Sequence, residues 1–281
     1  MNLSAWIRLA ACLATETTLL LAVAALLEYC LRSPRAARTI WQAALATVAL
    51  VWNVQLSGLH GAMPAASLKK TRYLIFSRIL PPSVQQSKTN DKASPTEVAP
   101  AMPVSDIVKW PAWLWLAGST LLLSRFCLAR VWLAVRELAA LPADEESRRL
   151  IARWQTGLGL AHLRSQVWPG LPSPIAFGIL RPAIALPPDF LVRFSSAERE
   201  AVLAHEMAHL AARDPFWLMV SDAAAALAWW HPLLWWARHR LQSASESAAD
   251  EASALVPGGA HALAECLVRL GHELTAPHPA R

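Results

Sequence analysis

Three long runs of apolar residues dominate the first half of the chain, over residues 9–27, 40–59 and 110–135. A helix needs about 20 apolar residues to cross the hydrocarbon core of a bilayer, and each run meets that length. Between the second and third runs, residues 60–109 are rich in Pro, Ser, Lys and Gln, which predicts an irregular loop without a core of its own. The pattern predicts a mainly α-helical membrane protein whose residues 1–136 form three spanning helices.

Beyond the third run the pattern becomes that of a domain lying against the membrane, over residues 137–281. Residues 145–158 are expected to form a helix. The short apolar runs 175–177 and 183–186, each preceded by proline, are typical of strands. The second part of the chain is therefore expected to mix helices with a few short strands.

The composition fits a membrane protein. Hydrophobic residues make up 55% of the chain and charged residues 16%, below the quarter or so usual for soluble domains. The 14 Trp against two Tyr suit a protein with membrane–water interfaces. The four Cys share no C-x-x-C spacing, so neither a disulfide framework nor a cysteine metal cluster is predicted. The net charge of +6 is spread over several loops, and direct nucleic-acid binding is not expected.

The distribution of arginine predicts the orientation in the membrane. The tight loop between the first two spans carries Arg32, Arg35 and Arg38, and the segment after the third span, on the same side, is also rich in arginine. The loop on the opposite side is basic too, but it is much longer, and short loops weigh more in the positive-inside rule. The second domain is therefore expected in the cytoplasm.

The residues that indicate chemistry form an H-E-x-x-H motif, with His205 and His209 four apart. Ser195 and Glu198 match a capping box, which predicts a helix over residues 197–212 that contains the motif. Residues four apart lie on one face of a helix, so both imidazoles can bind one zinc ion. Glu206, one residue round the helix, could hold a water molecule beside the ion and act as the catalytic base. The alternative is a helix with two unrelated histidines.

A catalytic zinc needs a third protein ligand, and the chain geometry points to Glu246. Residues 216–230 read as an apolar helix, and His231-Pro232 marks a turn because proline favours the first position of a helix. At 1.5 Å per residue, the next 15 residues return about 22 Å, which brings Glu246 back to the zinc helix. Residues 216–255 are therefore expected to form a hairpin that dips into the membrane, since a spanning helix would leave Glu246 on the wrong side.

Asp250 lies one turn beyond Glu246 on the same face. It could accept a hydrogen bond from one of the ligand histidines without binding the metal. The alternative for both carboxylates is a solvated polar face of the helix. With one zinc ion held by His205, His209 and Glu246, the site would be that of a metallopeptidase.

These features together resemble the peptidase M56 family, the membrane metallopeptidases of the β-lactam sensor-transducers BlaR and MecR. The resemblance covers most of residues 110–270 and rests on an ordered set of segments: Pro174-Ile175-Ala176-Phe177-Gly178, Arg181-Pro182-Ala183-Ile184, Leu186-Pro187, Val202 to His209, Arg213-Asp214, Pro232-Leu233-Leu234-Trp235, Glu246 and Ala249-Asp250. It implies a gluzincin-like zinc metallopeptidase domain with His205, His209 and Glu246 as ligands and Glu206 as the base. It also implies a cytoplasmic protease domain on a protein of the bacterial inner membrane.

The resemblance implies a function in regulated proteolysis, in which the domain cleaves a transcriptional repressor or itself after a signal crosses the membrane. Two features depart from the family: His231 replaces the usual Asn before the proline of the turn, and the sequence contains no penicillin-binding domain, so β-lactam sensing is not expected. Two other functions stay open, a quality-control membrane protease of the HtpX type and a catalytically silent membrane adaptor. Membrane lipid and a protein substrate are the expected partners.

Overall fold

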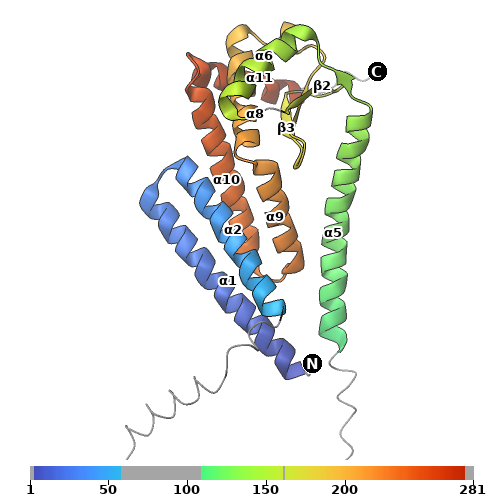
Figure 1. Cartoon of the computed structure of the whole chain (residues 1–281), viewed down its shortest axis with the longest axis vertical. Helices are drawn as coiled ribbons and strands as arrows, with labels where there is room; N and C mark the ends of the chain where they lie inside the picture. The colour runs from blue at the N-terminus through green and yellow to red at the C-terminus, as the bar shows by residue number, and fades with distance from the viewer. Residues whose placement is uncertain (1–2, 58–108, 161, 276–281) are drawn as a thin grey trace, which may run out of the picture.

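The computed structural model describes residues 3–57, 109–160 and 162–275, and the chain is mostly helical (Figure 1). Three helices are long and apolar enough to span a membrane, over Ile7–Leu31, Pro34–Leu56 and Trp110–Leu138, which confirms the predicted number of spans. They belong to α1 (Leu3–Leu31), α2 (Pro34–Leu56) and α5 (Lys109–Leu138). The predicted irregular loop 60–109 lies outside the described residues, apart from Lys109 at the start of α5.

The surfaces of these three helices are suited to lipid. Only 17%, 22% and 6% of their most apolar windows are buried inside the protein, so most of their large apolar side chains face outward. Exposing that much apolar surface to water would cost about 25 cal/mol for each Å², which a bilayer avoids. Glu16 in the middle of α1 is bound by the Nε2 of Gln55 at 2.9 Å, so this carboxylate has a partner on α2.

A helical hairpin packs beside the membrane spans. It consists of α9 (Asp214–Leu227) and α10 (Pro232–Ala254), which run down and back up beside α2 in Figure 1. The first helix begins two residues earlier than the sequence predicts, because Asp214 and Pro215 open α9 and do not merely end the preceding helix. Proline is accepted in a first turn because its missing N–H has no partner there in any case.

The tip of the hairpin reaches far along the spans. The Nε2 of His231, at the turn, lies 3.4 Å from the Oγ1 of Thr18, in the middle of α1. On the other side, the Nε1 of Trp115 in α5 donates to the carbonyl of Leu227 at 2.7 Å. From the top of α1 at Leu31 down to Thr18 is about 20 Å of helix, whereas the hydrocarbon core of a bilayer is about 30 Å thick. A bilayer around the three spans would therefore enclose most of the hairpin.

Polar contacts fasten α10 to the first two helices. Glu28 of α1 accepts a hydrogen bond from the Nε1 of Trp41 at 3.0 Å and pairs with the guanidinium of Arg240. Trp41 is completely buried and meets the ring of Trp236 edge-on, with the ring centroids 5.2 Å apart. The helix that carries Glu246 is thus held against the α1–α2 pair along one side.

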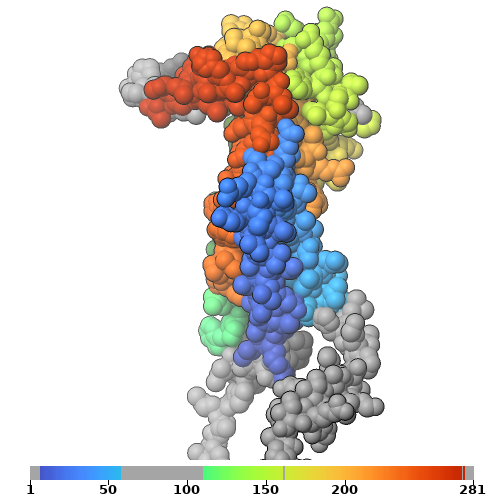
Figure 2. All heavy atoms as spheres, turned by 90° about the vertical axis from the view of Figure 1, so that its left-hand side faces the viewer, coloured from blue at the N-terminus to red at the C-terminus, as the bar shows by residue number. Residues whose placement is uncertain are grey.

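The remaining elements form a head above the helical stem. They are β1 (Leu141–Pro142), α6 (Glu145–Leu158), β2 (Arg164–Val167), β3 (Ile175–Phe177), β4 (Ala183–Leu186), α7 (Phe190–Arg193), α8 (Ser196–Ala211) and α11 (Gly259–Thr275). The strands form a sheet in the order β1-β2-β4-β3, with β2 and β4 parallel and the outer pairs antiparallel. The final helix, which the sequence pattern did not predict, projects to one side of the head (Figure 2).

The core of the head forms around one face of α8. Leu203 and Met207 of this helix are completely buried against Ile184 of the sheet and Cys266 of α11. Packing on this scale fixes the rotation of α8, because turning the helix would remove these side chains from the core. The opposite face of α8, which carries the two motif histidines, then faces α10.

Candidate metal centre

The capping box predicted from the sequence is present at the start of α8. The N–H of Glu198 donates to the Oγ of Ser195 at 3.3 Å, and the Oε2 of Glu198 accepts from the N–H of Ser195 at 2.7 Å. The other carboxylate oxygen of Glu198 pairs with the Nη1 of Arg269 at 2.8 Å. Bonds to the flanking backbone and hydroxyl and to Arg269 outweigh the effect of burial, so the pKa of Glu198 is lowered. A charged cap of this kind fixes where α8 begins.

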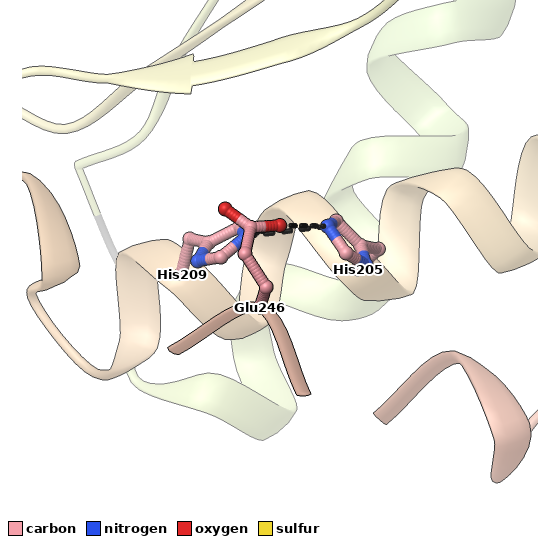
Figure 3. Close-up of side chains that lie close together, drawn as sticks. All are labelled: His205, His209 and Glu246. Carbon is pink, nitrogen blue, oxygen red and sulfur yellow. Dashed lines mark hydrogen bonds and ion pairs between the residues drawn. The ribbon is translucent and has the colours of Figure 1, made fainter. Parts of the chain in front are cut away.

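Two imidazoles and one carboxylate converge between α8 and α10 (Figure 3). The Nε2 atoms of His205 and His209 lie 3.2 Å apart. The Oε2 of Glu246 lies 3.6 Å from the Nε2 of His205 and 3.8 Å from that of His209. The hairpin therefore returns Glu246 to the motif helix, as the length of its two arms predicts.

The three ligand atoms suit a small divalent ion. Around a tetrahedral zinc with bonds of about 2.0–2.1 Å, neighbouring ligand atoms stand about 3.3 Å apart, close to the distances between these side chains. The two imidazole nitrogens that face each other at 3.2 Å share one hydrogen bond when one of them is protonated, and both present a lone pair to the same point when neither is. Two nitrogens and one oxygen are a donor set that proteins use for catalytic zinc, with a fourth position left open.

The charges around the site favour a cation. Burial lowers the pKa of His205, but the carboxylate of Glu246 and the charges of Glu206 and Asp250 outweigh it and raise the pKa overall. The interaction with His205 lowers the pKa of Glu246. Both shifts reflect the contact between the two side chains: the carboxylates favour a positive charge on His205, and the imidazoles favour the charged form of Glu246. A divalent metal ion would supply the positive charge that these carboxylates favour.

Glu206 is held beside the two histidines by a strand. Its Oε2 accepts a hydrogen bond from the backbone N–H of Ala176 in β3 at 2.6 Å, whereas no hydrogen bond to its Oε1 is found among the described residues. Burial raises the pKa of Glu206, although the two histidines and the N–H of Ala176 act in the opposite direction. A carboxylate with a raised pKa beside a metal site is suited to accept and return a proton.

The polar partner of His209 is a residue that the sequence analysis did not single out. The Nδ1 of His209 lies 2.8 Å from the Oδ2 of Asp214, whose side chain is 1% exposed. A buried carboxylate on the far nitrogen of a ligand histidine fixes the orientation and the tautomer of the ring. The signal was present in the sequence, since Asp214 opens the next helix directly after the motif helix.

Asp250, the carboxylate that the sequence predicts as a hydrogen-bond partner of a motif histidine, is more exposed and less well aligned than Asp214. Its Oδ1 lies 3.1 Å from the Nδ1 of His205, but the two groups are not aligned for a hydrogen bond, and that nitrogen has no other partner in the described part of the chain. The side chain of Asp250 is 59% exposed. The structure therefore places Asp250 near His205 without the buried, aligned contact that Asp214 makes with His209.

Comparison with known proteins agrees with this geometry. Residues 7–266 match the family model described as BlaR1 peptidase M56. The chain belongs to the peptidase M56 family. The resemblance inferred from the motif segments is thereby confirmed, and it extends over the membrane spans as well as the head.

A relative within peptidase M56 is the regulatory protein BlaR1 of Bacillus licheniformis. It is 33% identical to this chain over 82 residues, which is 29% of this chain and 14% of that protein. The match thus spans a small part of the length of the relative. Together with the three apolar helices, family membership makes this chain a BlaR1-like membrane protein of a metallopeptidase family.

Proposed function

We propose that this M56 protein is an integral-membrane zinc metalloendopeptidase with a gluzincin-like head. The observation that carries the proposal is the convergence of His205, His209 and Glu246 from two different helices to within ligand distance of one ion. Surface acidic residues can lie near histidines by chance, but Glu246 reaches the histidines only because the hairpin of α9 and α10 returns the chain to α8. Glu206, next to His205, would be the catalytic base.

The roles of the side chains follow from their contacts. Zinc held by the three ligands would polarise a peptide carbonyl and lower the pKa of a water molecule. Glu206 would take the proton of that water through its Oε1 and pass it to the leaving amine, while the N–H of Ala176 holds its Oε2. Asp214 would keep His209 oriented throughout.

The sheet offers a place for a peptide substrate. β3 is an edge strand, and the N–H of Ala176 points toward α8 and away from β4. Because this N–H already donates to Glu206, an extended peptide could add to the edge through its remaining backbone groups, which would lay its peptide bonds across the site. Because an edge strand binds the middle of a chain as well as its end, this arrangement favours an endopeptidase.

The site lies at the same end of the spans as the α1–α2 turn (Figure 1). Arg32 lies in this turn, and Arg35 lies in the first turn of α2. By the positive-inside rule that end would be cytoplasmic in a bacterial inner membrane. A cytoplasmic site and a relative named as a regulatory protein favour cleavage of a cytoplasmic regulator, such as a transcriptional repressor, or of the chain itself. Membership of M56 favours this reading over a quality-control protease of the HtpX type.

The test compares Glu206→Gln with wild type, both purified in detergent and loaded with zinc. Glu200→Gln is the matched control, because Glu200 lies on the same helix and binds Trp154 outside the site. Glu206→Gln is expected to keep one zinc per chain and to lose cleavage of labelled casein and of itself by about 100-fold or more. Cleavage by Glu206→Gln at the wild-type rate would refute the proposal, and a zinc-loaded wild type that cleaves neither would favour the silent adaptor.

A further inference from the structure

We propose that Arg38 and Gln42 of α2 position the metal ligand His209 through Asp214, so that a membrane-spanning helix sets how tightly the site holds its metal. The inference rests on the proposed zinc function. It assigns to two side chains of the second span a part in the metal site, although neither approaches the metal itself. Both would be positioning residues, acting through the carboxylate between them and the ligand.

The contacts form a continuous path from α2 to the ligand. The Nη1 of Arg38 lies 3.5 Å from the Oδ2 of Asp214, and the Nε2 of Gln42 lies 3.4 Å from its Oδ1. The same Oδ2 lies 2.8 Å from the Nδ1 of His209. Gln42 also donates to the carbonyl of Ala212 at 3.4 Å, in the short connection between α8 and α9. Both oxygens of Asp214 are therefore engaged by α2, and one also by the ligand.

Burial strengthens the interaction between Arg38 and Asp214. The side chain of Asp214 is 1% exposed and that of Arg38 16% exposed, so water screens their interaction little. In the described part of the chain, Arg38 is the arginine or lysine that pairs with Asp214. A buried carboxylate that loses its cationic partner is strongly destabilised in its charged form. Without Arg38, Asp214 would lose a contact that holds its Oδ2 in place beside His209.

The position of Asp214 depends on the short connection between α8 and α9. Arg213, directly before it, has the left-handed backbone conformation with φ of 57°, which is unfavourable for a residue with a side chain. The contacts of Gln42 with Ala212 and Asp214 brace this connection on both sides of Arg213. Removing the brace would give the connection freedom to relax, and Asp214 would move with it.

The position of α2 makes it suited to transmit a change. The helix qualifies as a membrane span, and its Trp41, between the two polar residues in sequence, packs against Trp236 of α10. Helix shifts of about 1–2 Å are common in switching proteins. The contacts of Arg38 and Gln42, at 3.4–3.5 Å, are at the limit for hydrogen bonds, so a shift of this size would break them. Movement of α2 in the membrane would thus loosen His209.

Arg35 provides a matched control on the same helix. It lies one turn before Arg38 and pairs with Glu251 of α10, but its side chain is 55% exposed and that of Glu251 41% exposed. An exposed pair of this kind contributes little, because water screens it. Replacing either arginine by Met removes the same charge from the same end of the span, whereas only Arg38 contacts Asp214.

The experiment measures the rate at which a chromophoric chelator removes zinc from the full chain in detergent. Arg38→Met and Gln42→Leu are expected to release zinc about tenfold faster than wild type, the effect typical of support around a ligand histidine. Arg38→Lys should restore much of the wild-type rate, and Arg35→Met should leave it unchanged. The cobalt(II)-substituted Arg38→Met variant should show an altered visible absorption band, which a loss of folding stability alone would not produce.

A double variant decides whether the effect passes through Asp214. In an Asp214→Asn background, adding Arg38→Met should change zinc release by less than about twofold, because the path is already cut. Equal zinc release from wild type, Arg38→Met and Gln42→Leu would overturn the inference and leave the zinc function intact, as would full additivity in the double variant. A wild type that binds no zinc would overturn both.

Discussion

Replacing Asp214 by Asn is expected to weaken zinc binding far more than the same replacement of Asp250. Each carboxylate lies near the Nδ1 of one histidine of the proposed zinc site, so the two variants make the same chemical change at comparable places. The structure distinguishes them by burial and alignment. Asp214 is 1% exposed with its oxygen 2.8 Å from His209, whereas Asp250 is 59% exposed and is not aligned with His205.

The expected magnitudes follow from these surroundings. A hydrogen bond to a charged, buried partner contributes about 1.5–3 kcal/mol. Since about 1.4 kcal/mol corresponds to tenfold in affinity, Asp214→Asn should weaken zinc binding by about 10-fold to 100-fold. An exposed, poorly aligned charge contributes about 0–1 kcal/mol, so Asp250→Asn should weaken it by about fivefold at most.

The assay is a zinc titration of each purified variant in detergent, in competition with a chelator of known affinity. Thermal unfolding of the zinc-free variants checks that a difference in affinity does not reflect partial unfolding. If Asp250→Asn loses as much affinity as Asp214→Asn, or more, then burial and alignment do not determine which carboxylate supports the site, and the assignment of Asp214 is wrong.

Two further predictions concern stability. The folded-state pKa of Glu198 lies below its ordinary value of 4.5, so its charge stabilises the fold above that pH and the stabilisation is lost as the pH falls. Glu198→Gln should therefore lower the free energy of unfolding by about 1–2 kcal/mol at pH 7 and by little under acidic conditions, as measured by thermal unfolding at both pH values. At Gly118 in α5, an added Cβ would lie 2.6 Å from the ring of Trp229, so Gly118→Ala should lower the melting temperature. The control Gly157→Ala, which has open space around the added Cβ, should not lower it, and equal effects of the two variants would exclude close packing of α5 on the hairpin.

Much of the site could be predicted from the sequence, because it depends on the regular geometry of helices. The spacing of His205 and His209 requires only helical geometry, and the capping box at Ser195 marks where that helix begins. The return of Glu246 follows from two helical arms of similar length around the turn at His231. Each of these inferences depends on the rise of a helix and on one turn signal, which a single sequence contains.

The contacts that depend on tertiary packing were beyond the same reasoning. Arg38 entered the sequence analysis only as a charge that orients the membrane spans, because nothing local indicates that it meets a carboxylate 176 residues later. Asp214 entered the sequence analysis only within the Arg213-Asp214 segment of the family resemblance, since its contact with His209 depends on the left-handed turn at Arg213. Asp250 was expected to support a histidine from its spacing alone, but spacing gives neither the angle of a side chain nor its exposure.

The zinc content of Glu246→Ala tests the central claim most directly. Wild type, Glu246→Ala and the control Glu251→Ala, on the same helix, would be dialysed against a weak chelator and analysed for metal per chain. The account predicts one zinc for wild type and for Glu251→Ala, and a large loss for Glu246→Ala, because two histidines alone hold zinc weakly. Full retention of zinc by Glu246→Ala would contradict it.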